Sequence, residues 1–347
     1  MTQTPITTDI KHFSFLATLR AVAAHKVVWP LLALALIFLI DFLISPNFFS
    51  IRIVEGRLFG SVIDILYRAV PTALVALGMA VVIGTKGIDL SVGAVVAIVG
   101  AVMCNLIHRD MSPLLVLALT LGTGVLCGMW NGFLVAFLDI QPIIATLILM
   151  VAGRGIALLI DAGLIVTFRS DFFSAISTGQ FLTVPSRIIV CAGTFLALWL
   201  VLRRTALGLF IESVGANAAA ADLAGINARL VKIGAYTLSG LCSGIAGMLI
   251  CGDIRGSDSN NAGLFIELDA ILAVVIGGGT LMGGRFYLAL TIVGVLIIQG
   301  LTTSILVSPL PWQFTMVVKG VVVLIVLLLQ SRRLRESIVG LFLRRKS

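Results

Sequence analysis

Asp89 is the residue best placed for chemistry, because it lies in the glycine-containing stretch 84–93 inside an apolar run from about 70 to 107. A run of this length can cross a bilayer twice, since one crossing takes about 20 residues. The stretch is therefore expected to be a turn or an interrupted helix at membrane depth, where glycine lets the backbone bend. A carboxylate there is costly unless it faces protein, water or a partner.

Two roles for Asp89 are compatible with this position. It can cap the following helix, which is expected to begin near residue 90, by accepting hydrogen bonds from N–H groups that have no partner within the helix. Alternatively, it can act as a gate that contacts cargo or a neighbouring helix in one state only. We favour the capping role.

A second glycine-rich stretch echoes the first in the other half of the chain. The segment 80–84 recurs as 273–277, which leads into a glycine-rich break ending at Gly284 and containing Thr280. Paired interruptions in the two halves of a membrane protein point to a translocation path between the halves. Two ordinary turns in a repetitive hydrophobic sequence are an equally good interpretation of the residues alone.

The segment 114–138 carries small residues four positions apart, a spacing that lets helix backbones approach closely; they are Gly124, Gly128 and Gly132. Asn131 lies within this motif, where it either bonds a neighbouring helix or faces the path. A path for a neutral polar cargo needs hydrogen-bonding groups beside aromatic or apolar walls. The candidate path residues are Asp89, Ser91, Trp130, Asn131 and Thr280.

Catalytic, phosphate-binding and metal-binding patterns are missing from the sequence. The segment 84–87 lacks the spacing of a phosphate-binding loop, and 238–241 resembles an ATPase signature only faintly and lies in an apolar helix. No convergent acid–base or nucleophile set is visible. The three histidines are scattered and the five cysteines form no CxxC pair, so we interpret the cysteines as packing residues. We therefore expect no catalytic residue, no metal site and no cofactor bound by this chain.

Composition indicates a polytopic α-helical membrane protein. Of 347 residues, 59% are hydrophobic and 12% are charged, against about 25% charged in soluble domains. Long apolar runs, rather than alternation, argue against a β-barrel. The net charge of +8 is concentrated in the C-terminal tail, as expected for a cytoplasmic tail beside anionic lipid rather than for nucleic-acid binding.

About ten transmembrane helices are predicted, some of them interrupted by glycine-rich breaks. They cover residues 27–44, 63–83, 90–107, 114–138, 143–160, 187–202, 230–250, 264–277, 286–306 and 314–330. Ten spans place both termini on one side, and the surplus of Lys and Arg there makes that side cytoplasmic. The domains are then a cytoplasmic segment 1–26, one transmembrane domain 27–330, and a basic cytoplasmic tail 331–347.

Some charged residues near or inside these spans are expected to find partners. Asp64 and Arg68 are four positions apart and can pair on one helix face, although a solvated helix end explains them at least as well. Arg154 is expected to pair with a carboxylate or to extend to an interface.

The longest polar interior segment is 203–230, which is too polar to span a membrane and too short to form a domain. Its centre favours a short helix. By shape it is a docking element, and a plain connector is an equally good interpretation of its residues.

Three motifs in this order resemble those of the ribose/xylose/arabinose class of ABC-transporter permeases, over roughly residues 60–330. The first is Gly87-Ile88-Asp89-Leu90-Ser91, the second is the loop 205–227, and the third is the segment 267–278. Further stretches, including 146–155, are most similar to the permease subunits of galactofuranose importers. Lys86 departs from the class, in which a small residue or glycine is more usual.

This resemblance implies the permease subunit of an inner-membrane importer that translocates a monosaccharide, with galactofuranose as the sugar. It implies a cytoplasmic ATPase with tandem domains that carries ATP–Mg²⁺, a periplasmic sugar-binding protein, and a second, related permease. The ATPase is expected to couple through Gly208, Glu212, Gly215, Asn217 and Gly225. The chain itself is then not an enzyme.

Two other classes of protein compete with this interpretation. An ion-coupled secondary transporter of a small polar solute would need ion ligands within its helices, and the carboxylate candidates Asp89, Glu267 and Asp269 all lie near helix ends. A membrane enzyme or structural subunit is the third possibility, and an enzyme would need a convergent titratable set. A neighbouring gene for tandem ATPase domains would favour the importer.

Overall fold

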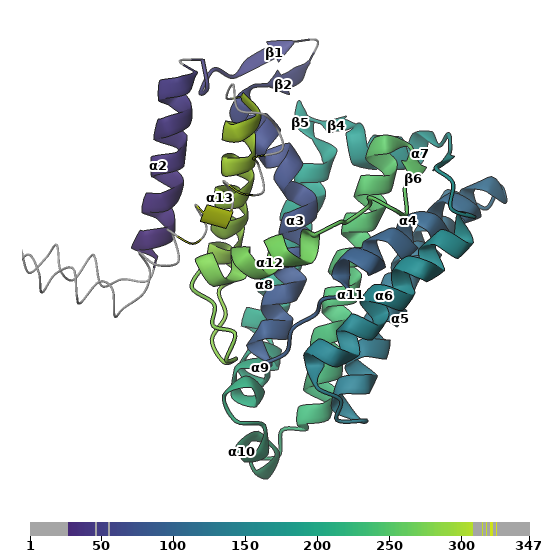
Figure 1. Ribbon diagram of the computed structural model, residues 1–347, viewed down its shortest axis with the longest axis vertical. Coiled ribbons are helices and arrows are strands. Elements are labelled where there is room, and N and C mark those ends of the chain that lie inside the picture. Colours follow the sequence, from purple (N-terminus) through teal and green to yellow (C-terminus); the bar gives the residue numbers. More distant parts are fainter. Residues whose placement is uncertain are drawn as a thin grey trace, which may run out of the picture.

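The computed structural model describes residues 27–307, apart from 46 and 55, together with residues 314, 317, 320, 321 and 324. Most of these residues are helical (Figure 1). Six helices are long and apolar enough to cross a membrane: α3 (Ser61–Gly84), α5 (Pro113–Ala136), α6 (Pro142–Ile160), α8 (Ser186–Arg204), α11 (Ala228–Ile254) and α13 (Leu288–Val307). The expected cytoplasmic ends and most of the expected last span lie outside the described residues.

The remaining helices are shorter than these six. They are α2 (Val28–Ile44), α4 (Val92–His108), α7 (Asp171–Thr178), α9 (Leu207–Ala216), α10 (Ala218–Leu223) and α12 (Ile266–Ile276). The expected span 264–277 is therefore corrected, because α12 has 11 residues and measures about 16 Å, half of a bilayer core. It begins late because Gly263 and Phe265 have left-handed φ values of +66° and +61°, which keep the preceding chain non-helical.

Three short antiparallel strand pairs complete the described fold. β1 (Arg52–Val54) pairs with β2 (Arg57–Phe59), β3 (Val166–Thr167) with β6 (Gly256–Ser257), and β4 (Gln180–Phe181) with β5 (Val184–Pro185). The strands and α7 gather at one end of the helices, whereas α9 and α10 lie at the other end (Figure 1). We call these the α7 end and the α9 end.

Helix α3 forms the centre of the bundle, packed by α8, α11, α12 and α13. From Ala69 to Thr85 every residue except Thr72 is buried. A helix that is apolar on all sides suits such an enclosed position. Helix α12 lies across the middle of the bundle at a steep angle to α3 (Figure 1).

The small-residue motif of α5 packs directly on α11, as its spacing predicts. A Cβ atom added to Gly124 would lie 2.6 Å from the carbonyl oxygen of Gly240, and one added to Gly132 would lie 2.8 Å from the Cα of Ile233. A Cβ atom on Gly128 would overlap the carbonyl of Tyr236. The two backbones therefore touch along this line, and glycine is required at each of these α5 positions.

Candidate functional site

The carboxylate of Asp89 lies between the end of α3 and the start of α4 and is 1% exposed. Its Oδ1 accepts hydrogen bonds from the backbone N–H of Ser91 at 3.1 Å and from the hydroxyl of Ser91 at 2.7 Å. Helix α4 begins at Val92 with Ser91 as its N-cap residue. The prediction that Asp89 itself is the N-cap is therefore corrected: Asp89 fixes the N-cap residue, and helix α4 begins two residues later than expected.

Two further helices donate to the same carboxylate. The Nδ2 of Asn131 in α5 donates to the Ser91 hydroxyl at 2.7 Å and to Asp89 Oδ1 at 3.4 Å. The hydroxyl of Ser239 in α11 donates to Asp89 Oδ2 at 2.8 Å. We call Asp89, Ser91, Asn131 and Ser239 the Asp89 network. It ties the start of α4 to α5 and α11 in the interior.

The predicted path residues divide into two groups. Asp89, Ser91 and Asn131 meet in the Asp89 network, all of them buried. Trp130 is 52% exposed, with its ring centroid 6.4 Å from that of Phe133, and lies outside the Asp89 network. Thr280 is exposed and donates to the carbonyl of Gly283 at 3.2 Å, away from the network.

Ser239 was missed by the sequence analysis. Its only local signal is its position next to Gly240, the small residue that brings α11 against α5. The serine lies 150 residues from Asp89 in the chain, so no local pattern places the two together.

The network holds a carboxylate without a cationic partner. Within the described part of the chain, the ion pairs are Arg68–Asp64 and Arg187–Asp253, and neither includes Asp89. Hydroxyl and amide dipoles alone therefore solvate Asp89. Burying a carboxylate is costly unless donors replace the water that it loses, and these donors come from three segments: Ser91 before α4, Asn131 in α5 and Ser239 in α11. The Asp89 network therefore links α4, α5 and α11 through hydrogen bonds and not through an ion pair.

The two glycine-rich breaks meet at the α9 end. The N–H of Gly284 donates to the carbonyl of Gly84 at 3.0 Å. Gly215, near the end of α9, fills the remaining space: a Cβ atom there would overlap the Gly84 carbonyl and lie 2.6 Å from the N atom of Gly284. We call Gly84, Gly215 and Gly284 the glycine junction. It joins the predicted coupling loop to the turn that carries Asp89.

The other predicted coupling residues lie around α9 and α10. Gly208 is buried at the start of α9, and Glu212 is half-buried on the same helix. Asn217 caps α10 by accepting the N–H of Ala220 at 3.1 Å. Gly225 has a left-handed φ of +83°, which favours glycine, and ends the helical part of the loop. The loop is thus helical, as its sequence favours.

Lys86 also has a left-handed backbone, with φ of +67°. Glycine, which the resemblance leads us to expect here as one alternative to a small residue, adopts this conformation at lower cost because it has no Cβ. Lys86, Gly215, Asn217, Lys232 and Tyr236 are among the residues that line a cavity of about 630 Å³ at the α9 end. The hydroxyl of Tyr236 donates to the carbonyl of Ile88 at 3.4 Å, so this cavity ends directly beneath the Asp89 turn.

Comparison with known proteins identifies related permeases. Residues 61–327 match the family described as "Branched-chain amino acid transport system / permease component". The galactofuranose transporter permease protein YtfT of Escherichia coli K12 is 55% identical over 324 residues, which cover 92% of this chain and 95% of that protein. The ribose import permease protein RbsC of Escherichia coli K12 is 35% identical over 87% of this chain and 93% of the relative.

A fructose relative extends the comparison beyond these two sugars. The fructose import permease protein FruF of Bifidobacterium longum is 32% identical over 90% of each chain. No solved structure matches this chain.

Proposed function

Because this chain belongs to the branched-chain amino acid transport system / permease component family, we propose that it translocates a sugar as one subunit of an ATP-binding-cassette importer. The chain is a multi-pass protein of the inner membrane. Galactofuranose is the proposed cargo. The support is a galactofuranose transporter permease that is 55% identical over 92% of the chain. Two other relatives of this chain are a ribose import permease protein and a fructose import permease protein, so a monosaccharide cargo fits the group.

The glycine junction is the structural observation that carries the mechanism. A helical polar loop, α9–α10, contacts the Asp89 turn through Gly215 without an intervening side chain. Two backbones in direct contact leave no soft side chain to absorb a displacement. A partner that pushes on α9 therefore moves the end of α3 and the start of α4. We assign this partner as a cytoplasmic ATPase with tandem domains, which binds ATP–Mg²⁺ while this chain binds no cofactor.

The orientation of the chain in the membrane decides where the other partners of the assembly bind. The α9 end faces the cytoplasm, because basic residues are concentrated on that side of the predicted topology. The α7 end then faces the periplasmic sugar-binding protein. A second, related permease completes the pathway. Residues 27–330 form a single transmembrane domain, flanked by cytoplasmic segments 1–26 and 331–347.

The sugar path is proposed to pass the Asp89 network. Opening such a path requires α4, α5 and α11 to separate, and the hydrogen bonds of Asp89, together with the backbone packing of α5 on α11, hold them in place. A network of neutral donors around one acceptor is strong in the closed state and can exchange partners with sugar hydroxyls in an open one.

Reconstitution tests this function directly. The chain, its related permease and the ATPase are placed in proteoliposomes with the sugar-binding protein, and uptake of labelled galactofuranose is measured. We expect uptake that requires ATP and survives both a protonophore and removal of sodium. Uptake driven by an ion gradient without ATP would instead support the secondary transporter. An active complex that showed no ATP-dependent uptake of any monosaccharide would refute the proposal.

A further inference from the structure

A second cavity, of about 380 Å³, lies towards the α7 end. Its walls come from α3, from the end of α11, from the loop after β6, and from the first turn of α12. Thr72, the one residue of α3 between Ala69 and Thr85 that is not buried, faces this cavity. We call it the α7-end cavity. Its volume lies within the range of small-molecule sites.

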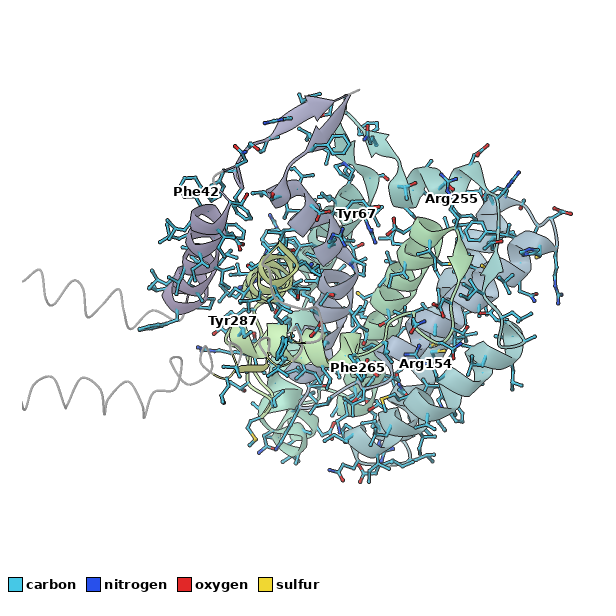
Figure 2. The ribbon with its side chains drawn as sticks, turned by 45° about the horizontal axis from the view of Figure 1, so that its top comes forward. Phe42, Tyr67, Arg154, Arg255, Phe265 and Tyr287 are labelled. Carbon is cyan, nitrogen blue, oxygen red and sulfur yellow. The ribbon has the colours of Figure 1, made fainter. Side chains whose placement is uncertain are left out.

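The loop after β6, which forms one wall of the cavity, is held in place by residues of α6. Arg154 Nη1 donates to the carbonyls of Ser259 at 3.1 Å and Ala262 at 2.6 Å. In Figure 2, Arg154 lies beside the loop that leads to Phe265. Of the two alternatives predicted for Arg154, a carboxylate partner or extension to an interface, the first is thus corrected to these two carbonyls. A partly buried arginine with carbonyl acceptors fixes loop geometry well, because the guanidinium is planar and carries several donors.

A second anchor acts on the same loop. Oδ2 of Asp161, the C-cap residue of α6, accepts from the hydroxyls of Ser257 at 2.6 Å and Ser259 at 2.5 Å. Within the loop, Asn261 Nδ2 donates to Asp258 Oδ2 at 2.8 Å. The polar side chains of this wall are therefore positioned before any ligand arrives, which lowers the entropic cost of binding.

The lining of the α7-end cavity has a distinctive chemistry. Its polar side chains are Thr72, Asp258, Asn261 and Asp269, and apolar residues such as Ile250 and Ile254 complete the wall. Both ionisable lining residues are carboxylates. Carboxylate and amide groups accept hydrogen bonds from hydroxyls, whereas two carboxylates repel an anionic ligand. The α9-end cavity differs, since two lysines, Lys86 and Lys232, are among its lining residues.

The two cavities lie on the same pair of helices and are closed from each other. Thr72 of α3 lines one cavity and Thr85, the C-cap residue of α3, lines the other, about 20 Å away at 1.5 Å per residue. Between them, a Cβ atom on Gly78 of α3 would lie 2.7 Å from the Cα of Ser239, the α11 member of the Asp89 network. The network therefore lies where the route from one cavity to the other is shut.

We infer that the α7-end cavity is the loading site for a neutral sugar, in which Asp258, Asn261, Asp269 and Thr72 bind hydroxyl groups and the carboxylates exclude anionic sugars. This inference rests on the proposed function for the class of ligand. The cavity chemistry itself is testable without transport.

Thiol labelling of the reconstituted complex tests the inference. Thr72→Cys and Asn261→Cys are made separately in a Cys127→Ser, Cys191→Ser background, because the other three cysteines are buried. Each is reacted with a cationic and an anionic methanethiosulfonate reagent, alone and with millimolar galactose or galacturonate. Asn260→Cys is the matched control, since Asn260 is in the same loop, is exposed and does not line the cavity.

We expect both cavity cysteines to react several-fold faster with the cationic reagent, and Asp269→Asn to reduce this preference. Galactose should slow the reaction and galacturonate should not, while Asn260→Cys shows neither effect. Equal rates with the two reagents, or equal protection by the two sugars, would overturn the inference. Because reagent preference needs no ATP, it can fail while ATP-driven uptake succeeds, so failure of the cavity assignment is distinct from failure of the proposed function.

Discussion

The N–H of Gly284 donates a 3.0 Å hydrogen bond to the carbonyl of Gly84, which joins two glycine-rich turns from opposite halves of the chain. The sequence echo between these turns was compatible with a path between the halves or with two ordinary turns, and the structure shows that the two turns are in contact. Gly215 of α9 packs against both the carbonyl of Gly84 and the N atom of Gly284. In the proposed mechanism, a motion of the α9–α10 loop reaches both halves of the bundle through these backbone contacts.

Replacing Gly215 with alanine should disturb this transmission, even though the change adds a single methyl group. The new Cβ overlaps the carbonyl of Gly84, so α9 must move away from the turn. We expect membrane insertion to be retained while sugar-stimulated ATP hydrolysis and uptake fall together several-fold. Gly234→Ala is the control, because a Cβ atom there meets no atom within 4 Å. Unchanged stimulation in Gly215→Ala would show that the junction does not transmit motion.

Substitutions of Asp89 separate hydrogen bonding from charge. Asparagine keeps one oxygen acceptor for Ser91, and the Ser239 hydroxyl can turn to accept from the new amide. We expect Asp89→Asn to express normally and to transport. Asp89→Ala leaves several buried donors without an acceptor, each costing about 1–3 kcal/mol, so its expression and apparent melting temperature should fall. A well-expressed Asp89→Asn protein without uptake would mean that the charge itself is required.

The two ion pairs near the α7 end should differ greatly in their contribution to stability. Arg187 is 4% exposed, pairs with Asp253 at 3.0 Å and lies 4.2 Å from the ring centroid of Tyr67. Arg187→Gln should destabilise the protein by about 1.5–3 kcal/mol, because it removes a charge-assisted hydrogen bond to Asp253, whose side chain is 35% exposed and can regain water.

The matched comparison is Arg68→Gln. The Arg68–Asp64 pair is real but exposed, at 56% and 48%, so its loss should change stability by about 1 kcal/mol or less. Thermal unfolding in detergent, followed by the fraction of soluble monodisperse protein, measures both variants. Equal decreases in melting temperature for the two variants would contradict the larger contribution that we assign to the Arg187–Asp253 pair.

The α5–α11 contact predicts a sharp difference between two glycines on one helix. Gly128→Ala should force the helices apart, because its Cβ overlaps the carbonyl of Tyr236. Gly122→Ala meets no atom within 4 Å and should be neutral or slightly stabilising, since alanine favours helix. Because Asn131 and Ser239 lie on these two helices, Gly128→Ala should also lower uptake. Similar melting temperatures for both variants would argue against direct backbone packing.

Local patterns predicted the parts of this site that depend on one segment. The spacing of Gly124, Gly128 and Gly132 indicated a packing face, and the polar break in an apolar run indicated the Asp89 turn. These features depend on the period of a helix and on bilayer thickness, both of which are readable from sequence.

The parts that depend on distant segments were not predictable in the same way. Ser239, the Arg187–Asp253 pair and the carbonyl partners of Arg154 are all brought together by the arrangement of helices. The segment 264–277 was expected to span because it is apolar, but its 14 residues measure only about 21 Å as a helix, and the left-handed residues before α12 move its start two residues further on. Hydrophobicity alone does not reveal where the chain turns.

The shortness of α12 has a consequence for how the protein is made. A segment of 11 helical residues cannot enter lipid on its own as it leaves the ribosome, because its terminal N–H and C=O groups would meet hydrocarbon. It packs on α3, which is synthesised before it, and on α13, which is synthesised after it. Helix α12 therefore reaches its place only after a later part of the chain has been translated, and a nascent protein that stops before α13 would leave this segment outside the membrane, exposed to proteolysis.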